Sequence, residues 1–154
     1  MECLSPKLEF YFNNVTVPPQ TGGWKMLADV EGSLKINLGG NIFFEEDDIL
    51  LLELVVALIK WLHKIESGEI VDLYYESMDY EEQPILAFIT NDGCTWHLYS
   101  VWQNFNDSSH ISLNVLLQTT KNFIIELITH LQTNFCLDLS SLLRGHPEAK
   151  IVSS

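Results

Sequence analysis

The chain opens with a regular alternation of apolar and polar residues. In residues 8–13, Leu8, Phe10 and Phe12 fall on one side and polar residues separate them. A period of two is typical of a β-strand with one buried face. The proline- and glycine-rich residues 18–23 then indicate a loop.

The same alternation returns over residues 26–38, interrupted at Glu31-Gly32-Ser33. We expect a tight turn at these three residues, joining two strands. Residues 39–41, with two glycines, predict a second turn into a strand at residues 42–44.

A helix is predicted from about residue 49 to residue 67, where the sequence is apolar on nearly every side. The acidic run Glu45-Glu46-Asp47-Asp48 precedes it and would complement the positive end of the helix dipole, with Asp47 or Asp48 as the cap. Gly68 is a helix terminator. A helix apolar all round must be covered on more than one side, by a second layer of the fold or by a homodimer.

Three more strands follow, at residues 69–76, 85–89 and 94–102. The run 85–89 is continuously apolar, which favours a central strand covered on both faces. Asn91-Asp92-Gly93 is a hairpin signal, and Trp96 and Leu98 should face the same way. Ser112 would cap a last helix, whose apolar residues recur at helical spacing: Leu113, Leu116, Leu117, Phe123, Ile124, Leu127, Ile128, Leu131 and Phe135.

These elements predict an α+β fold in a single domain spanning residues 1–154. We expect a mainly antiparallel sheet of about six strands with two long helices packed on one face, because hairpin connections dominate. The polar tail from about Arg144 is expected to fray.

Charge narrows the range of partners. The 154 residues carry 8 Lys and Arg against 21 Asp and Glu, a net charge of −13. Nucleic acids need a basic face and anionic membranes repel an acidic one, so we expect neither as a partner. At 47% hydrophobic residues the composition is that of a folded domain.

The start of the chain lacks the basic residues and apolar run of a secretory signal, and no apolar stretch is long enough to cross a bilayer. Cys3, Cys94 and Cys136 are odd in number and lack a disulfide spacing. We therefore expect a cytoplasmic protein with free thiols.

No catalytic motif is present. The glycine pairs match no phosphate-binding loop, and no nucleophile elbow occurs. Cys94 and His97 form half of a zinc-ligand spacing without a second half, and Glu45 to Asp48 lack the alternation and the glycine of an EF-hand. We therefore predict no enzyme activity, no cofactor and no metal.

The acids concentrate in one segment. No Lys or Arg occurs between Lys64 and Lys121, and Tyr74, Tyr75 and Tyr80 lie among seven acids from Glu66 to Glu82. Such a segment is either a solvated surface or a face for a basic partner. The residues predicted to bind that partner are Asp72, Tyr74, Glu76, Asp79, Tyr80, Glu81 and Glu82.

Several sequence blocks resemble the small acidic immunity proteins of Bacillus-type polymorphic toxin systems, over roughly residues 8–135. The blocks are Asp29-Val30-Glu31-Gly32, Phe43-Phe44-Glu45, Tyr75-Glu76-Ser77-Met78-Asp79, Gln83-Pro84-Ile85-Leu86 and Ser100-Val101-Trp102. The resemblance implies an immunity protein that binds the C-terminal domain of a toxin and neutralises it. A nuclease toxin would have a basic substrate groove, which an acidic face could cover.

Two other functions fit the same sequence. One is a small ligand-binding or adaptor domain whose acidity only maintains solubility. The other is a hydrolase that uses carboxylates, since an acidic chain contains many pairs of them.

Overall fold

A computed structural model describes residues 5–17, 30–77 and 81–136 of the chain. In chain order its elements are β1 (Leu8–Thr16), β2 (Glu31–Leu38), β3 (Asn41–Leu50), α2 (Leu51–Glu66), β4 (Leu73–Tyr75), β5 (Leu86–Thr90), β6 (Thr95–Tyr99), β7 (Ile111–Ser112) and α3 (Leu113–Phe135). The α+β prediction is confirmed. The predicted tail from Arg144 and the strand residues 26–29 lie outside the described residues.

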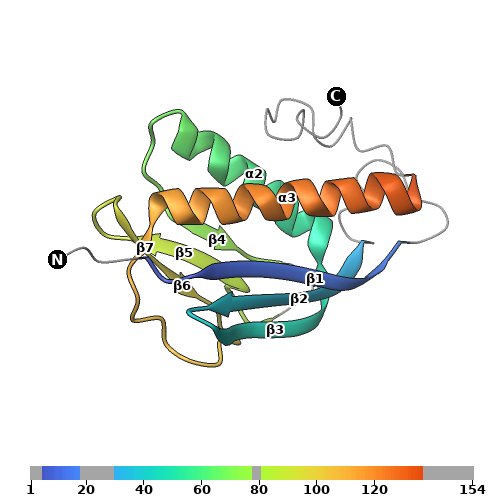
Figure 1. Ribbon diagram of the computed structural model, residues 1–154, viewed down its shortest axis with the longest axis horizontal. Helices are drawn as coiled ribbons and strands as arrows, with labels where there is room; N and C mark the ends of the chain where they lie inside the picture. The colour runs from blue at the N-terminus through green and yellow to red at the C-terminus, as the bar shows by residue number, and fades with distance from the viewer. Residues whose placement is uncertain (1–4, 18–29, 78–80, 137–154) are drawn as a thin grey trace.

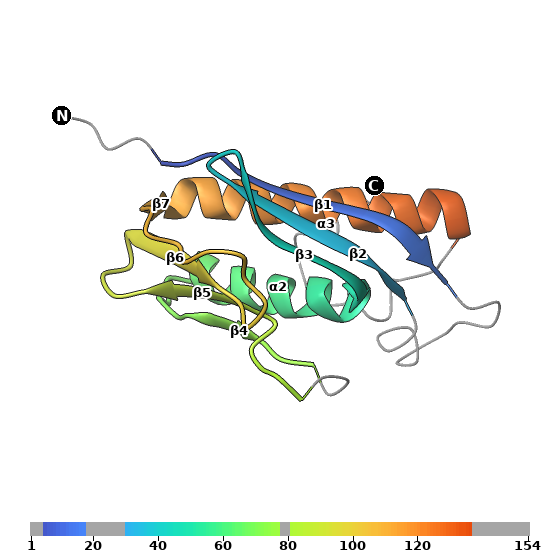
Figure 2. The same cartoon turned by 90° about the horizontal axis from the view of Figure 1, so that it is seen from below.

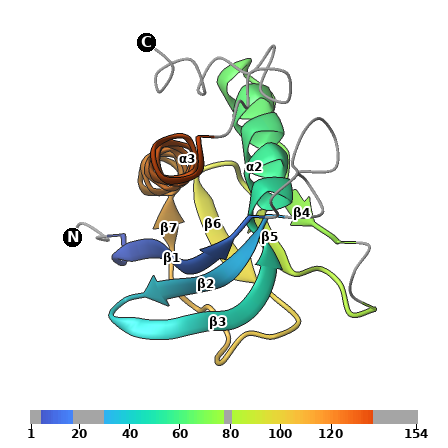
Figure 3. The same cartoon turned by 90° about the vertical axis from the view of Figure 1, so that its right-hand side faces the viewer.

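The strands form two antiparallel sheets and not the one sheet expected from the sequence. One has the order β1-β2-β3 and the other the order β4-β5-β6-β7. The two helices lie side by side on one side of the strands, as predicted (Figures 1 and 3). Seen from below, α3 runs along β1 while α2 lies nearer the four-stranded sheet (Figure 2).

One hydrophobic core joins both sheets and both helices. The Phe88 ring on β5 lies 6.2 Å from Phe10 on β1 and 5.1 Å from Trp61 on α2, measured between ring centroids. This shared core also covers α2, whose apolar residues are buried on several sides as expected. A second layer of the same chain therefore accounts for the burial of α2.

The expected turn at Glu31-Gly32-Ser33 is wrong, because all three residues lie within β2. Gly32 is required there for space. A Cβ on it would lie 2.6 Å from Leu51 Cδ1 and 2.9 Å from the Asn13 carbonyl oxygen. The predicted turn after β2 is confirmed, with Gly39 and Gly40 both at positive φ.

The acidic run Glu45 to Asp48 also lies elsewhere than predicted. It belongs to β3, where Glu45 pairs with Lys35 and Glu46 with Leu34 of β2. The helix begins afterwards, at Leu51, and its N-cap Leu50 offers no side-chain hydrogen bond. The strand pairing with β2 outweighs the local preference of these carboxylates for a helix N-terminus.

The elements from the end of α2 onward agree more closely with the sequence prediction. Gly68 follows α2 at φ +102°, and the predicted hairpin joins β5 to β6. The Ser112 hydroxyl caps α3 by accepting a hydrogen bond from the Val115 amide at 3.2 Å. The strand predicted over residues 69–76 is shorter, only β4, and β7 was not predicted. No helix in the described ranges has the length and apolar character needed to cross a membrane.

Candidate partner-binding surface

Strand β4 divides its side chains between the core and the outside of the four-stranded sheet. Leu73 and Tyr75 point inward and are buried, while Tyr74 is 57% exposed. The Tyr75 hydroxyl donates to Glu53 Oε1 at 2.9 Å and also contacts the Leu50 carbonyl oxygen. Tyr75 therefore fixes β4 against the start of α2 and is not part of the exposed surface.

Two exposed tyrosines flank a buried alanine on the outer face of this sheet. In the strand register Tyr74 pairs with Ala87, and Ala87 pairs with Tyr99 on β6. Ala87 is 0% exposed and Tyr99 is 41% exposed. We call Tyr74, Ala87 and Tyr99 the tyrosine row. Tyr99 was missed by the sequence reasoning, although alternation from Trp96 and Leu98 already places it on the outer face.

Asp72, one of the predicted binding residues, lies beside Tyr74 and accepts two hydrogen bonds from within the protein. Its Oδ1 accepts a hydrogen bond from the Thr90 amide at 3.0 Å, and its Oδ2 accepts one from the Tyr74 hydroxyl at 3.2 Å. The charge of Asp72, followed by desolvation and this hydrogen bond, raises the pKa of Tyr74. Tyr74 is thus held in place as a protonated hydrogen-bond donor.

The remaining predicted acids lie in and beside the loop between β4 and β5. Glu76, Glu81 and Glu82 are exposed, whereas Asp79 and Tyr80 lie outside the described residues. The Gln83 side chain closes this loop by accepting from the Ser77 amide at 3.1 Å and donating to the Ser77 carbonyl. The structure thus places three of the predicted carboxylates in solvent near one end of β4.

The Tyr75 side chain also links β4 to the end of β3. Tyr75 contacts Leu50, which is two residues after Asp48, and Glu76 directly follows Tyr75. The end of β3 and strand β4 are therefore joined beside the start of α2 by this side chain. Partial burial, and secondarily the charge of Asp47, raises the pKa of Glu46 on this strand.

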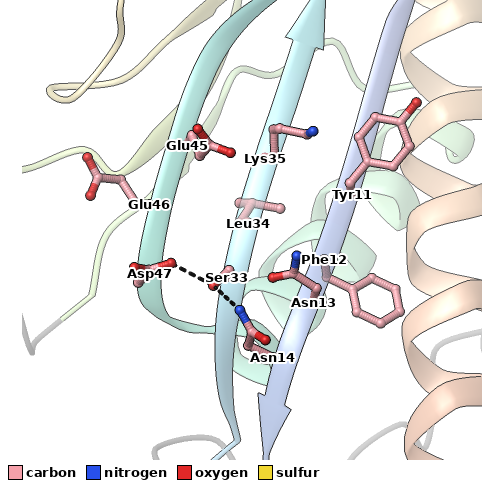
Figure 4. Close-up of a pocket in the computed structure, with 10 residues that line it drawn as sticks. All are labelled: Tyr11, Phe12, Asn13, Asn14, Ser33, Leu34, Lys35, Glu45, Glu46 and Asp47. Atoms are coloured by element: carbon pink, nitrogen blue, oxygen red, sulfur yellow. Dashed lines mark hydrogen bonds between the residues drawn. The ribbon is translucent and has the colours of Figure 1, made fainter.

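A shallow hollow of about 680 Å³ lies over the three-stranded sheet (Figure 4). The Ser33 hydroxyl at its floor donates to Asp47 Oδ1 at 2.6 Å and accepts from Asn14. The ammonium nitrogen of Lys35 lies 5.3 Å from the centroid of the Tyr11 ring. These side chains satisfy one another across the three strands.

The half zinc spacing does not become a site in the structure. Cys94 is exposed in the turn before β6, and His97 lies on β6 opposite Ile89. His97 instead makes an edge-to-face contact with His110, with 5.7 Å between ring centroids. Within the described residues no three His, Cys, Asp or Glu side chains gather to hold a metal ion.

Comparison with known proteins gives one result. A family profile described as "Domain of unknown function (DUF7878)" matches residues 8–133, which is more than half of the chain, so the chain belongs to this family. No curated protein and no solved structure shows a significant match.

Proposed function

We propose that this member of the DUF7878 family is a protein-binding domain that recognises a basic partner through the tyrosine row and the acids beside it. The observation that carries the proposal is the pair of exposed tyrosines, Tyr74 and Tyr99, set in register on either side of the fully buried Ala87. Tyrosine offers a large contact area at low entropic cost, and it is enriched among residues that dominate binding energy.

The neighbouring carboxylates supply the second part of the proposal. Glu76, Glu81 and Glu82 are exposed near β4, in a chain with a net charge of −13. Exposed charges at the rim of an interface act mainly on the rate of encounter and its salt dependence. Attraction by these acids and burial of the tyrosines would together favour a partner with a basic surface around an apolar patch.

The resemblance to immunity proteins supports one identity for this partner. In our proposal it is the C-terminal domain of a bacterial toxin, of the nuclease type, whose basic substrate groove is covered by the acidic, tyrosine-bearing face. The protein would act in the cytoplasm as an inhibitor, without catalysis and without a cofactor. A nuclease must bind a polyanion, so its groove has the charge that this face complements.

The test uses the protein encoded directly upstream of this chain's gene, in which the proposal predicts a toxin-like C-terminal domain. Co-expression with this protein should restore host growth, and the two purified proteins should form a stable complex. The Tyr74→Ala/Tyr99→Ala variant should lose both effects. Ile42→Ala is the matched control, because Ile42 is 41% exposed, like Tyr99, but lies on the three-stranded sheet.

Two results would reject the proposal. One is a complex that the double variant forms as tightly as the parent. The other is growth inhibition that this protein does not relieve at all. Circular dichroism melts of each variant would show whether the fold is retained.

A further inference from the structure

Two histidines lie next to the tyrosine row on the same face of the four-stranded sheet. The inward residues of β6 are Trp96 and Leu98, which are buried. Alternation therefore places His97 on the outer face, beside Tyr99. His110 lies directly before β7, the strand that pairs with β6, and its ring contacts that of His97. We call His97 and His110 the histidine pair.

The two imidazoles of the pair differ in their surroundings. His110 is exposed, whereas His97 is partly buried. The Nδ1 atom of His97 is buried and has no hydrogen-bond partner among the described residues. A charged imidazole carries a proton on both nitrogens, so charging His97 would bury an N–H group without an acceptor. A proton taken up by the pair therefore goes to His110.

The elements around the pair supply negative but no positive charge. Their titratable side chains are Asp72 and Tyr74 at β4, Asp92 and Cys94 in the hairpin, Tyr99 on β6 and Asp107 in the loop before β7. The part of β5 opposite His97 and the first two turns of α3 contain none. All four strands lie between Lys64 and Lys121, where the sequence has no Lys or Arg. The histidine pair is thus the place where positive charge can arise on this sheet.

A partner that covers the tyrosine row also reaches the histidine pair. Side chains two residues apart on a strand, such as His97 and Tyr99, are only about 7 Å apart. A standard interface buries about 800 Å² on each partner, which is more than two tyrosine side chains supply. An interface centred on Tyr99 therefore extends over His97 to His110.

We propose that the histidine pair belongs to the binding surface and that protonation of His110 weakens binding of the basic partner. This inference rests on the proposed function and adds the regulation of the same site. A protonated His110 places a positive charge against a basic surface, and like charges across an interface cost affinity. By reciprocity the complex binds this proton less tightly than the free protein does. The affinity then falls with pH across the range in which histidine changes its charge, about pH 5 to 8.

The test compares the complex with the upstream-encoded protein at pH 7.5 and pH 5.5. The parent should bind about tenfold more weakly at pH 5.5, because one excluded proton changes the affinity by up to about tenfold per pH unit. His110→Gln cannot become charged and should lose most of this difference. Titratable groups of the partner affect both proteins equally, so the comparison isolates His110.

A permanent charge should reproduce the effect of acid. His110→Lys should bind at pH 7.5 about as weakly as the parent does at pH 5.5. His63→Gln and His63→Lys are the matched controls, because His63 is exposed in the last turn of α2 and is not on the sheet. Both controls should keep the affinity and the pH dependence of the parent.

Three outcomes would overturn the inference while the proposed function stands, since a complex forms in each. They are equal affinity of the parent at both pH values, the same loss of affinity in the parent and His110→Gln, and full binding of His110→Lys at pH 7.5. Absence of any complex at pH 7.5 would instead reject the proposed function, and this inference with it. Circular dichroism melts at both pH values check that every variant is folded.

Discussion

The outer faces of the two sheets carry different chemistry. On the three-stranded sheet polar side chains pair across strands, with Lys35 over the Tyr11 ring and Ser33 bonded to Asp47. On the four-stranded sheet the centre is apolar, with Tyr74 and Tyr99 around Ala87. A partner that covers aromatic surface gains free energy from burial, whereas satisfied polar groups must first lose their hydration.

Under the proposed function, this difference would give the two sheets separate roles. The tyrosine row would supply side-chain area for binding, with acids beside it. The three-stranded sheet has a polar outer face that favours solvent. The following predictions test whether the two outer faces differ in this way over one common core.

The largest effect is expected for Phe88→Ala. Phe88 is fully buried and lies between Phe10 and Trp61, so its removal should cost about 3–5 kcal/mol in the free energy of unfolding. Urea unfolding followed by circular dichroism and by tryptophan fluorescence measures this. Tyr99→Ala, which removes an aromatic ring from the outer face, should cost less than about 1 kcal/mol. Two probes that unfold at different urea concentrations would show that the sheets have separate cores.

A smaller difference in stability is expected between two variants that each remove one carboxylate. Asp72 lies beside the four-stranded sheet and Asp47 lies on the three-stranded sheet. Asp72→Ala leaves the partly buried Thr90 amide without its acceptor and should cost about 1 kcal/mol or more. Asp47→Ala removes only the exposed hydrogen bond with Ser33 and should change stability by less than about 0.5 kcal/mol. Chemical unfolding of both variants checks the difference. Equal losses in the free energy of unfolding would mean that both carboxylates stabilise the fold to the same extent.

Kinetics distinguish the acids near the tyrosine row from those on β3. Glu81→Gln/Glu82→Gln should slow association with the toxin domain several-fold at low salt and flatten its salt dependence, with little change in dissociation. Glu45→Gln/Asp47→Asn removes the same charge from the three-stranded sheet and is the control. If both double variants slow association equally, only net charge matters; if only the control slows it, the interface is on β3.

The smallest expected effects are on the pH dependence of the melting temperature. Two carboxyl groups, Asp92 and Glu46, should affect it in opposite senses. Amide hydrogen bonds from Thr95 and Cys94 lower the pKa of Asp92 below its usual value. Its charge therefore stabilises the fold above the usual Asp pKa, and this contribution disappears in acid. Asp92→Asn should lower the melting temperature slightly at pH 7, and the difference from the parent should shrink as the pH falls through the lowered pKa.

Glu46 should behave in the opposite sense, because partial burial raises its pKa. The folded protein then holds this proton more tightly than the unfolded chain, so stability falls as the pH rises through the raised pKa. Glu46→Gln should therefore melt at the parent temperature or slightly above it at pH 7. Melting curves of both variants between pH 2 and pH 7 test these two directions. If both variants changed the melting temperature in the same direction at pH 7, the opposite pKa shifts of Asp92 and Glu46 would be refuted.

The sequence by itself determined the features that depend on near neighbours. Alternation places Tyr74 outward and Leu73 inward, helical spacing selects the buried stripe of α3, and Ser112 caps that helix. These follow from the period of each element and from short-range hydrogen bonds. The concentration of acids from Glu66 to Glu82 is likewise a property of the sequence alone.

Only the tertiary structure decided the features that depend on distant partners. The carboxylates of residues 45–48 suit a helix start locally, but pairing with β2 places them in a strand. Gly32 suits a turn, but the approach of Leu51 and Asn13 requires it inside β2. Tyr99 becomes part of a surface because β5 places it in register with Tyr74 across Ala87. The physical reason is the same in each case: strand pairing and close packing join residues far apart in sequence, and their free energy exceeds local preference.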